Sequence, residues 1–405
     1  MTNENINGVI ELGNENLKCL IFQINNDTSE IISKSVIKSE GIYNGVIVNL
    51  SKATSSIRSC INDAEKKAKI SLKKINVVFE SIDFLCTKFS KHKKIDGSKI
   101  HKDDIDFLLK EAKKQVNLND SKQSIIHIFN HNYIVDGKTF LEEPIDVYAD
   151  SLSHEMTFIS TPKNNLKNIN QAFIDCDIEI ERFISSTFAK AAKILKTEDL
   201  NSGAVLIDIN LEKTSIGLFK NLALVHLASL PVGIDHIKKD ISKVCSLNLK
   251  EAEKINNKID FSFENNTELF DQNGYLKNDF FQNSNFRKVS KSLLLNVAKS
   301  RIDEIFEMLK KQIIIKELNP NLGSTLIIVE EDSELLNFEK YCSNFFKSKV
   351  LVINKRTDDV FAEENFAACL GAVKIIKDGW ETEAIPKLAQ RLSKRKSFLS
   401  KIFGN

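Results

Sequence analysis

Short apolar runs bounded by turn residues open the chain and predict two strands joined by a tight turn. Residues 9–12 form the first run, residues 13–16 the turn, and residues 17–24 the second run. Over residues 50–70 the apolar positions recur at three- and four-residue spacing, which predicts an amphipathic helix with Ser51 as its N-cap. The chain therefore begins with the mixture of strands and helices that is typical of an α/β protein.

The pattern changes near residue 84, where strand-like runs surround one amphipathic helix at residues 102–116. We interpret residues 84–163 as an inserted α+β subdomain. A second strand–turn–strand unit begins at residue 204, and its first strand ends in an acidic residue, Asp208, just as the opening strand carries Glu11. The repetition of this unit predicts an internally duplicated fold with two lobes.

Length and composition agree with several compact units. The chain has 405 residues, 42% hydrophobic and 28% charged, as in folded globular proteins. A formal net charge of +2 excludes a general nucleic-acid-binding surface. Seven dispersed cysteines without a Cys-x-x-Cys pair predict reduced thiols and no structural zinc site. Residues 1–20 lack a signal-peptide pattern, and no apolar run is long enough to span a bilayer, which predicts a cytoplasmic protein.

The last segment, residues 386–403, contains no acidic residue, and its large apolar side chains recur on one helical face beside six basic residues. Pro386 suits the first position of a helix. A basic amphipathic helix of this kind lies in a membrane interface and favours anionic lipids. The alternative is a helix packed on the body or on another protein. The side chains predicted to contact the membrane are Leu388, Leu392, Phe398, Leu399, Ile402, Phe403, Lys394, Arg395 and Lys396.

Two strand–turn–strand units with an acid at the end of the first strand are typical of the actin/Hsp70/sugar-kinase fold. The chain resembles the FtsA family of bacterial cell-division proteins in particular. The segments that carry this resemblance are, in order, residues 45–50 and 64–68, 133–137, 230–241 and 301–306. The resemblance implies an α/β, actin-like (actin/Hsp70/sugar-kinase) two-lobed fold with an inserted α+β subdomain and a C-terminal amphipathic helix.

The domain boundaries that we predict follow this fold. They are 1–83 and 164–203 for the first actin-like lobe, 84–163 for the inserted subdomain, 204–232 and 319–376 for the second lobe, 233–318 for its outer subdomain, 377–385 for a linker, and 386–405 for the membrane-targeting helix.

The resemblance also implies a function. The protein is expected to anchor polymers of the tubulin-like protein FtsZ to the cytoplasmic face of the inner membrane at the division site, to recruit later division proteins, and to assemble into filaments. The FtsZ C-terminal tail is expected to bind residues 233–318, where Arg301 and Glu304 match the family. Two alternatives stay open: an actin-like ATPase of another system, or a PilM-like pilus assembly platform protein.

In this fold two turns hold ATP phosphates. They use glycines because a Cβ obstructs the approach of main-chain N–H groups, and an acid holds the water shell of magnesium. By resemblance, the matching residues here are Glu11, Gly13, Asn14, Asp208, Thr214 and Glu253.

The glycine-rich parts of this site are missing. Two glycine triplets of the family are replaced by residues 210–212 (Asn-Leu-Glu) and 330–332 (Glu-Glu-Asp), and an expected Lys is Asn256. A carboxylate ~4 Å from a phosphate charge costs roughly 1–4 kcal/mol. These turns are therefore either ordinary surface loops or a weak nucleotide site. ATP and magnesium are left open as cofactors, no catalytic residue is assigned, and we expect no enzyme.

Overall fold

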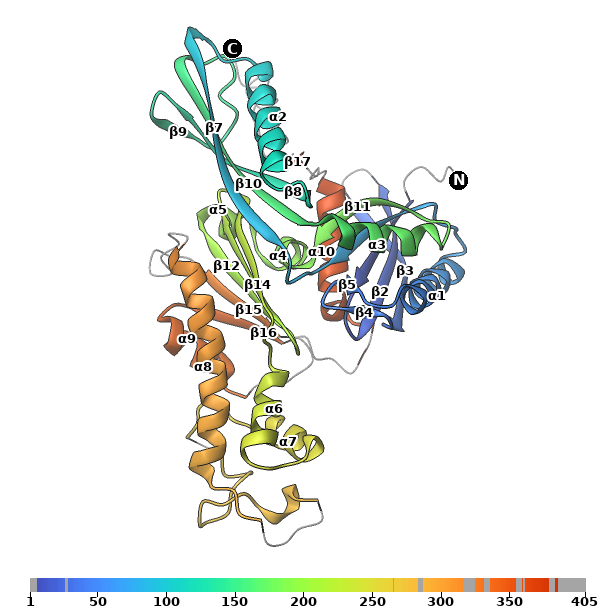
Figure 1. The fold of residues 1–405 in the computed structure, drawn as a ribbon, viewed down its shortest axis with the longest axis vertical. Helices are drawn as coiled ribbons and strands as arrows, with labels where there is room; N and C mark the ends of the chain where they lie inside the picture. The colour runs from blue at the N-terminus through green and yellow to red at the C-terminus, as the bar shows by residue number, and fades with distance from the viewer. Residues whose placement is uncertain are drawn as a thin grey trace, which may run out of the picture. The chain divides into compact units, whose positions relative to one another are not determined.

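The computed structural model describes residues 6–25, 28–264, 266–282, 287–315, 325–330, 336–354, 359, 361–378 and 383–384. By its internal contacts the chain divides into two compact units, which are described one at a time (Figure 1). The first unit comprises Met1–Ser202, Phe219–Leu227 and Asp359–Asn405, and the second comprises Gly203–Leu218 and Ala228–Asp358. The finer domain boundaries remain a prediction.

A five-stranded sheet forms the centre of the first unit, in the order β11-β6-β1-β2-β3. Strand β1 (Ile6–Leu12) pairs antiparallel with β2 (Asn16–Asn25), which confirms the strand–turn–strand unit at the start of the chain. β1 also pairs in parallel with β6 (Lys74–Phe79), and β6 pairs in parallel with β11 (Glu179–Ser185). The edge strand is β3 (Thr28–Lys38).

The predicted first helix is α1 (Leu50–Ala68), which follows a small hairpin of β4 (Ile42–Tyr43) and β5 (Val46–Ile47). The prediction of Ser51 as its N-cap is wrong. Asn49 is the cap, because its backbone is extended and its side-chain oxygen accepts a hydrogen bond from the Lys52 N–H at 3.0 Å.

Helices α3 (Lys163–Ile174), α4 (Ser186–Ile194) and α10 (Ala367–Asp378) also belong to this unit. Helices α4 and α10 lie side by side in close contact (Figure 1). A Cβ at Gly371 would lie 1.7 Å from the carbonyl oxygen of Ala189, so only glycine permits this approach. Helix α10 thus joins the first unit, although it follows the second lobe in sequence. The short elements nearby are α5 (Thr197–Ser202) and a 3-10 turn, Glu364–Phe366.

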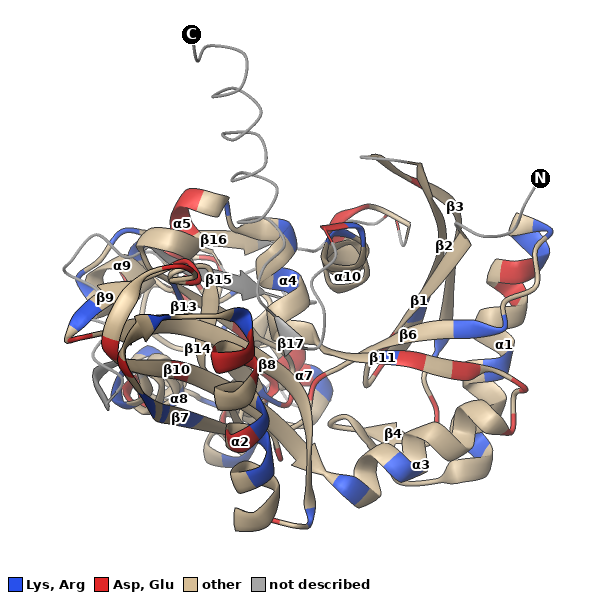
Figure 2. Cartoon of the chain, turned by 90° about the horizontal axis from the view of Figure 1, so that it is seen from above, with Lys and Arg blue, Asp and Glu red and all other residues tan. Residues whose placement is uncertain are grey.

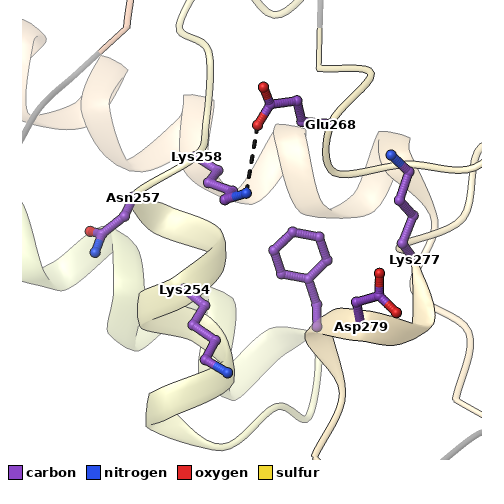
Figure 3. A pocket seen from close by; sticks show the side chains of 7 residues that line it. Lys254, Asn257, Lys258, Glu268, Lys277 and Asp279 are labelled. Atoms are coloured by element: carbon purple, nitrogen blue, oxygen red, sulfur yellow. Dashed lines mark ion pairs between the residues drawn. The ribbon is translucent and has the colours of Figure 1, made fainter.

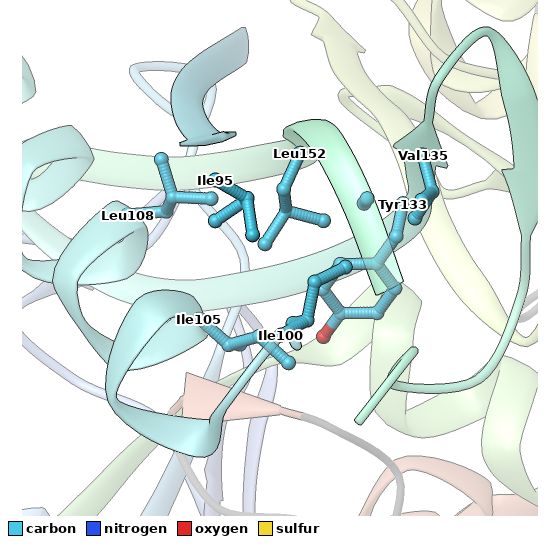
Figure 4. Packing of buried hydrophobic residues seen from close by; sticks show 8 residues of the cluster. Ile95, Ile100, Ile105, Leu108, Tyr133, Val135 and Leu152 are labelled. Atoms are coloured by element: carbon cyan, nitrogen blue, oxygen red, sulfur yellow. The ribbon is translucent and has the colours of Figure 1, made fainter. Parts of the chain in front are cut away.

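The inserted subdomain is α+β, as predicted. Its sheet has the order β17-β8-β10-β7, and β9 pairs with β8. These strands are β7 (Leu85–Lys99), β8 (Gln123–Val135), β9 (Lys138–Phe140), β10 (Tyr148–Pro162) and β17 (Glu383–Ala384). Helix α2 (Lys102–Asn119) packs on one face of the sheet through Ile105 and Leu108, which meet Ile95, Tyr133 and Leu152 in a buried cluster (Figure 4).

The second strand–turn–strand pattern lies in a five-stranded sheet with the order β14-β13-β12-β15-β16. The strands are β12 (Ala204–Ile209), β13 (Thr214–Lys220), β14 (Ala223–Leu230), β15 (Thr325–Glu330) and β16 (Val350–Asn354). The end of β13 and most of β14 fall in Phe219–Leu227, which is assigned to the first unit, and the other strands belong to the second. β12 pairs in parallel with β15, and β15 pairs in parallel with β16.

Helices build the outer part of the second unit. They are α6 (Asp235–Val244), α7 (Leu249–Asn256), α8 (Lys291–Ile315) and α9 (Phe338–Phe346), with a 3-10 turn at Asn278–Phe280. Aromatic side chains connect α8 and α9, because the Phe306 ring lies 5.8 Å from Phe338 and 5.0 Å from Phe346.

Candidate functional site

The β1–β2 turn places the first group of predicted nucleotide ligands together. Glu11 lies near the end of β1 and is only 8% exposed, with Lys18 directly opposite it on β2. The Lys18 ammonium lies 3.8 Å from the Glu11 carboxylate. The Glu11 carboxylate is therefore surrounded mostly by protein atoms, and the Lys18 ammonium on the other strand of the hairpin balances its charge.

Asn14 and Gly13 maintain the shape of this turn. The Asn14 side-chain amide donates to the side-chain oxygen of Asn44 at 3.0 Å and accepts from the Asn44 backbone N–H at 2.7 Å. A Cβ at Gly13 would lie 2.5 Å from the carbonyl oxygen of Asn16. Both predicted ligands thus have a role inside the protein that does not involve a phosphate.

The β12–β13 turn holds Asp208 and Thr214, which are both buried. The Thr214 hydroxyl donates a hydrogen bond to the carbonyl oxygen of Val232 at 2.8 Å. Its proton is therefore engaged in fixing the chain that follows β14.

The segment leading into α6 packs directly on the β12–β13 turn. The backbone N–H of Ile234 donates to Asn210 O at 3.0 Å, and that of Asp235 donates to Leu211 O at 2.9 Å. A Cβ at Gly233 would lie 2.1 Å from Asn210 O. The Pro-Val-Gly run that resembles the family thus has a structural explanation, since glycine allows the two backbones to touch.

Glu212, which stands in place of a family glycine, is paired within the second unit. Lys239 on α6 lies 2.8 Å from one Glu212 oxygen and 3.1 Å from Asp235. The hydrogen bond that Lys239 donates to Glu212 raises the pKa of Lys239 above its usual value. The turn therefore carries an ion-pair network where a phosphate cradle would need exposed N–H groups.

On α7 the sequence singled out Glu253, which is exposed, and missed Glu251, which is completely buried. The Glu251 carboxylate accepts hydrogen bonds from the N–H groups of Asn248 at 2.8 Å and Gln282 at 2.6 Å, and Arg287 lies 3.3 Å away. The sequence did contain a signal for Glu251. Asn248 stands three residues before it, and this spacing is typical of a capping box at the start of a helix.

The outer part of the second unit offers a polar surface on α8. Arg301 pairs with Asp240 of α6 and with Glu304 one turn further along α8. The hydrogen bond that Arg301 donates to Asp240 raises the pKa of Arg301 above its usual value. The two residues that match the family on α8 therefore form one ion-pair group that joins α6 to α8.

A cavity of about 600 Å³ lies between α7 and the 3-10 turn at Asn278–Phe280 (Figure 3). Lys258 pairs with Glu268 across it at 3.6 Å, as the dashed line in Figure 3 shows. Basic groups outnumber acidic groups in the lining, which consists of Lys254, Asn257, Lys258, Glu268, Lys277, Asp279 and Phe280.

Several predicted site residues lie outside the part that the structure describes. These are Glu331 and Asp332, the side chain of Glu330, and the membrane residues Leu388, Leu392, Lys394, Arg395, Lys396, Phe398, Leu399, Ile402 and Phe403. Among the described residues, no helix is long and apolar enough to cross a bilayer. Among these described residues, no group of three or more His, Cys, Asp or Glu side chains could hold a metal ion.

Solved structures with the same architecture identify the class of protein. The PilM–PilN type IV pilus biogenesis complex superposes with a TM-score of 0.60 at 10% identity, over 92% of this chain and 98% of the other. MreB5 of Spiroplasma citri bound to ADP superposes with a TM-score of 0.52 at 12% identity, over 93% and 98%. The fold is thus that of the actin-like proteins, as the two strand–turn–strand units predicted.

Sequence comparison identifies the family. Residues 205–371 match "Cell division protein FtsA", and residues 85–160 match "SHS2 domain inserted in FTSA". The FtsA of Buchnera aphidicola subsp. Baizongia pistaciae is 26% identical over 85% of this chain and 82% of its own length. That of Borreliella burgdorferi is 21% identical over 98% and 96%. The chain belongs to the FtsA family of cell-division proteins.

Proposed function

We propose that this actin-like protein anchors FtsZ polymers to the cytoplasmic face of the inner membrane at the division site and recruits later division proteins. One observation carries the proposal: a chain that matches both the FtsA family and its inserted SHS2 domain also contains a basic, acid-free amphipathic segment at residues 386–403. A division protein with its own lipid-binding segment can connect a cytoplasmic polymer to a membrane without a spanning helix.

The lipid-binding part of the proposal rests on charge and hydrophobicity. Six basic residues in residues 386–403 each contribute about 1 kcal/mol near an anionic surface. The large apolar side chains on the other face add their partial burial in the interface. Binding of this strength is reversible for one molecule and strengthens when several assemble on the same membrane.

The FtsZ tail is proposed to bind the outer subdomain, residues 233–318. The cavity beside α7 supports this placement, since three lysines and Phe280 favour a peptide with acidic and apolar side chains. The ion-pair group of Arg301, Asp240 and Glu304 offers a second polar contact surface in the same subdomain.

We propose that nucleotide binding is weak and that the protein is not an ATPase in practice. The polar groups of Asn14 and Thr214 bond within the protein, and Glu212 brings a carboxylate to the second turn. These residues do not fit a phosphate cradle. Filament assembly, which needs only a repeated head-to-tail contact, is proposed to proceed without ATP.

A reconstitution with FtsZ and anionic vesicles tests the proposal. Fluorescent FtsZ polymers should sediment with vesicles only when the full-length chain is present. A chain truncated after residue 385 should still co-sediment with FtsZ polymers but should no longer bring them to vesicles. FtsZ that fails to bind the full-length chain in the absence of lipid would refute the anchoring function, whatever the tail does. The similarity to PilM is one of fold alone, at 10% identity.

A further inference from the structure

The two edges of the inserted sheet differ in charge. Edge strand β7 carries five lysines, at positions 88, 91, 93, 94 and 99, which discourage pairing with another strand (Figure 2). Strand β8, near the opposite edge, has no charged residue and no proline in its whole length, Gln123–Val135. An uncharged, apolar edge of this kind readily accepts a further strand.

The chain itself supplies that strand. Glu383 pairs in parallel with Ile128, and Ala384 with Phe129, so that β17 extends the inserted sheet beyond β8 (Figure 1). β17 follows α10, which packs against α4, and it precedes the basic segment that begins at Pro386. Residues 383–384 therefore belong to the sheet of the inserted subdomain in this structure.

The stretch of β8 that β17 covers is also where the inserted subdomain meets the rest of the first unit. The His127 Nε2 accepts a hydrogen bond from the Ser185 N–H at 3.0 Å, at the start of α4. The ring of Phe129 lies 4.9 Å from that of Phe188 on α4. The side chains of His127 and Phe129 thus lie against the start of α4, while the backbone of Ile128 and Phe129 pairs with β17.

We propose that Glu383–Ala384 is a latch: these two residues of the chain occupy the strand-accepting edge of β8, beside the contacts that join the inserted subdomain to α4. The latch protects an edge that lacks the lysines of β7. Because only two residue pairs form it, it contributes little net stability and opens far more readily than the central strands.

Hydrogen exchange on the full-length protein, followed by mass spectrometry without lipid or FtsZ, tests the latch. The variant Glu383→Pro/Ala384→Pro removes both N–H groups, so neither can pair with β8 whichever of them faces it. Peptides covering residues 125–130 should exchange about tenfold faster than in the unmodified protein. Peptides from β1 and β2 should not change, which shows that the fold is intact.

The matched control is Glu383→Thr/Ala384→Val, which removes the same charge but keeps both N–H groups and favours a strand. It should exchange at the unmodified rate. A chain ending at Asp378 provides a second measurement and should reproduce the tenfold acceleration at residues 125–130. Unchanged exchange there in both the proline variant and the truncated chain would overturn the proposal. The result does not depend on membrane or FtsZ binding, so it stands apart from the proposed function.

Discussion

The imidazole of His127 accepts a hydrogen bond from the backbone N–H of Ser185, 3.0 Å away, and thereby joins the inserted subdomain to the start of α4. The ring is buried between aromatic neighbours, with Phe188 5.3 Å and Phe129 5.7 Å from it. Only a neutral imidazole has a nitrogen that can accept this bond. Burial, aided by the positive charge of Arg182, lowers the pKa of His127 to about 3.

This geometry predicts a pH dependence of stability. An unfolded histidine has a pKa of about 6.5, so between pH 6.5 and pH 3 the unfolded state binds a proton that the folded state excludes. Stability therefore falls as pH falls through this window, by up to about 1.4 kcal/mol per pH unit for this one residue. The free energy of unfolding, measured with denaturant between pH 7 and 4.5, should depend less steeply on pH for His127→Gln than for the unmodified protein. The exposed His92 provides the control, since His92→Gln should leave the slope unchanged.

Glu251 and Glu253 stand two residues apart on α7 and should respond very differently to replacement. Glu251→Ala leaves the N–H groups of Asn248 and Gln282 without their acceptor and removes the partner of Arg287, so we expect a loss of about 2–4 kcal/mol. Glu253→Ala alters only an exposed side chain and should stay within about 0.5 kcal/mol. Urea unfolding measures both. Equal losses would contradict the assigned role of Glu251.

Calorimetric titration with Mg-ATP should show binding weaker than micromolar. The reason is that Thr214 and Asn14 bond within the protein and that Glu212 places a carboxylate at the second turn. Likewise, millimolar Mg-ATP should produce only a small rise in melting temperature. An FtsA that retains its glycine triplets is the positive control. Micromolar or tighter affinity for this chain would disprove the prediction.

Vesicle co-sedimentation should separate the two contributions to membrane binding. Replacing Leu399 and Phe403 by Glu puts charge on the apolar face and should release the protein from vesicles at any salt concentration. Replacing Lys394, Arg395 and Lys396 by Ser should weaken binding less, and mainly on anionic lipid. Raising the salt concentration should imitate the second change only, because salt screens exposed charge. If the protein still sediments with vesicles after residues 386–405 are removed, the assignment of this segment as the membrane-binding part is wrong.

The sequence by itself determined the elements whose own pattern is strong. The alternating and continuous apolar runs predicted β1, β2, β12 and β13, and helical spacing predicted α1 and α2, because each pattern depends only on residues close together in the chain. The repeated strand–turn–strand unit, together with the resemblance to the FtsA family, predicted the actin-like fold. The boundary of α1 shows the limit of such reasoning, since Asn49 and Ser51 are both good caps and only the backbone decides between them.

Only the tertiary structure decided which polar residues have partners. Glu251 and Glu253 look equivalent in sequence, yet two residues on a helix point in nearly opposite directions, and packing chooses which one is buried. Asn14 bonds to Asn44, and Thr214 to Val232, across segments that the chain brings together only when it folds. The pairing of Glu383–Ala384 with β8 is of the same kind. Such contacts depend on where distant segments come to lie, and no local pattern of residues contains that information.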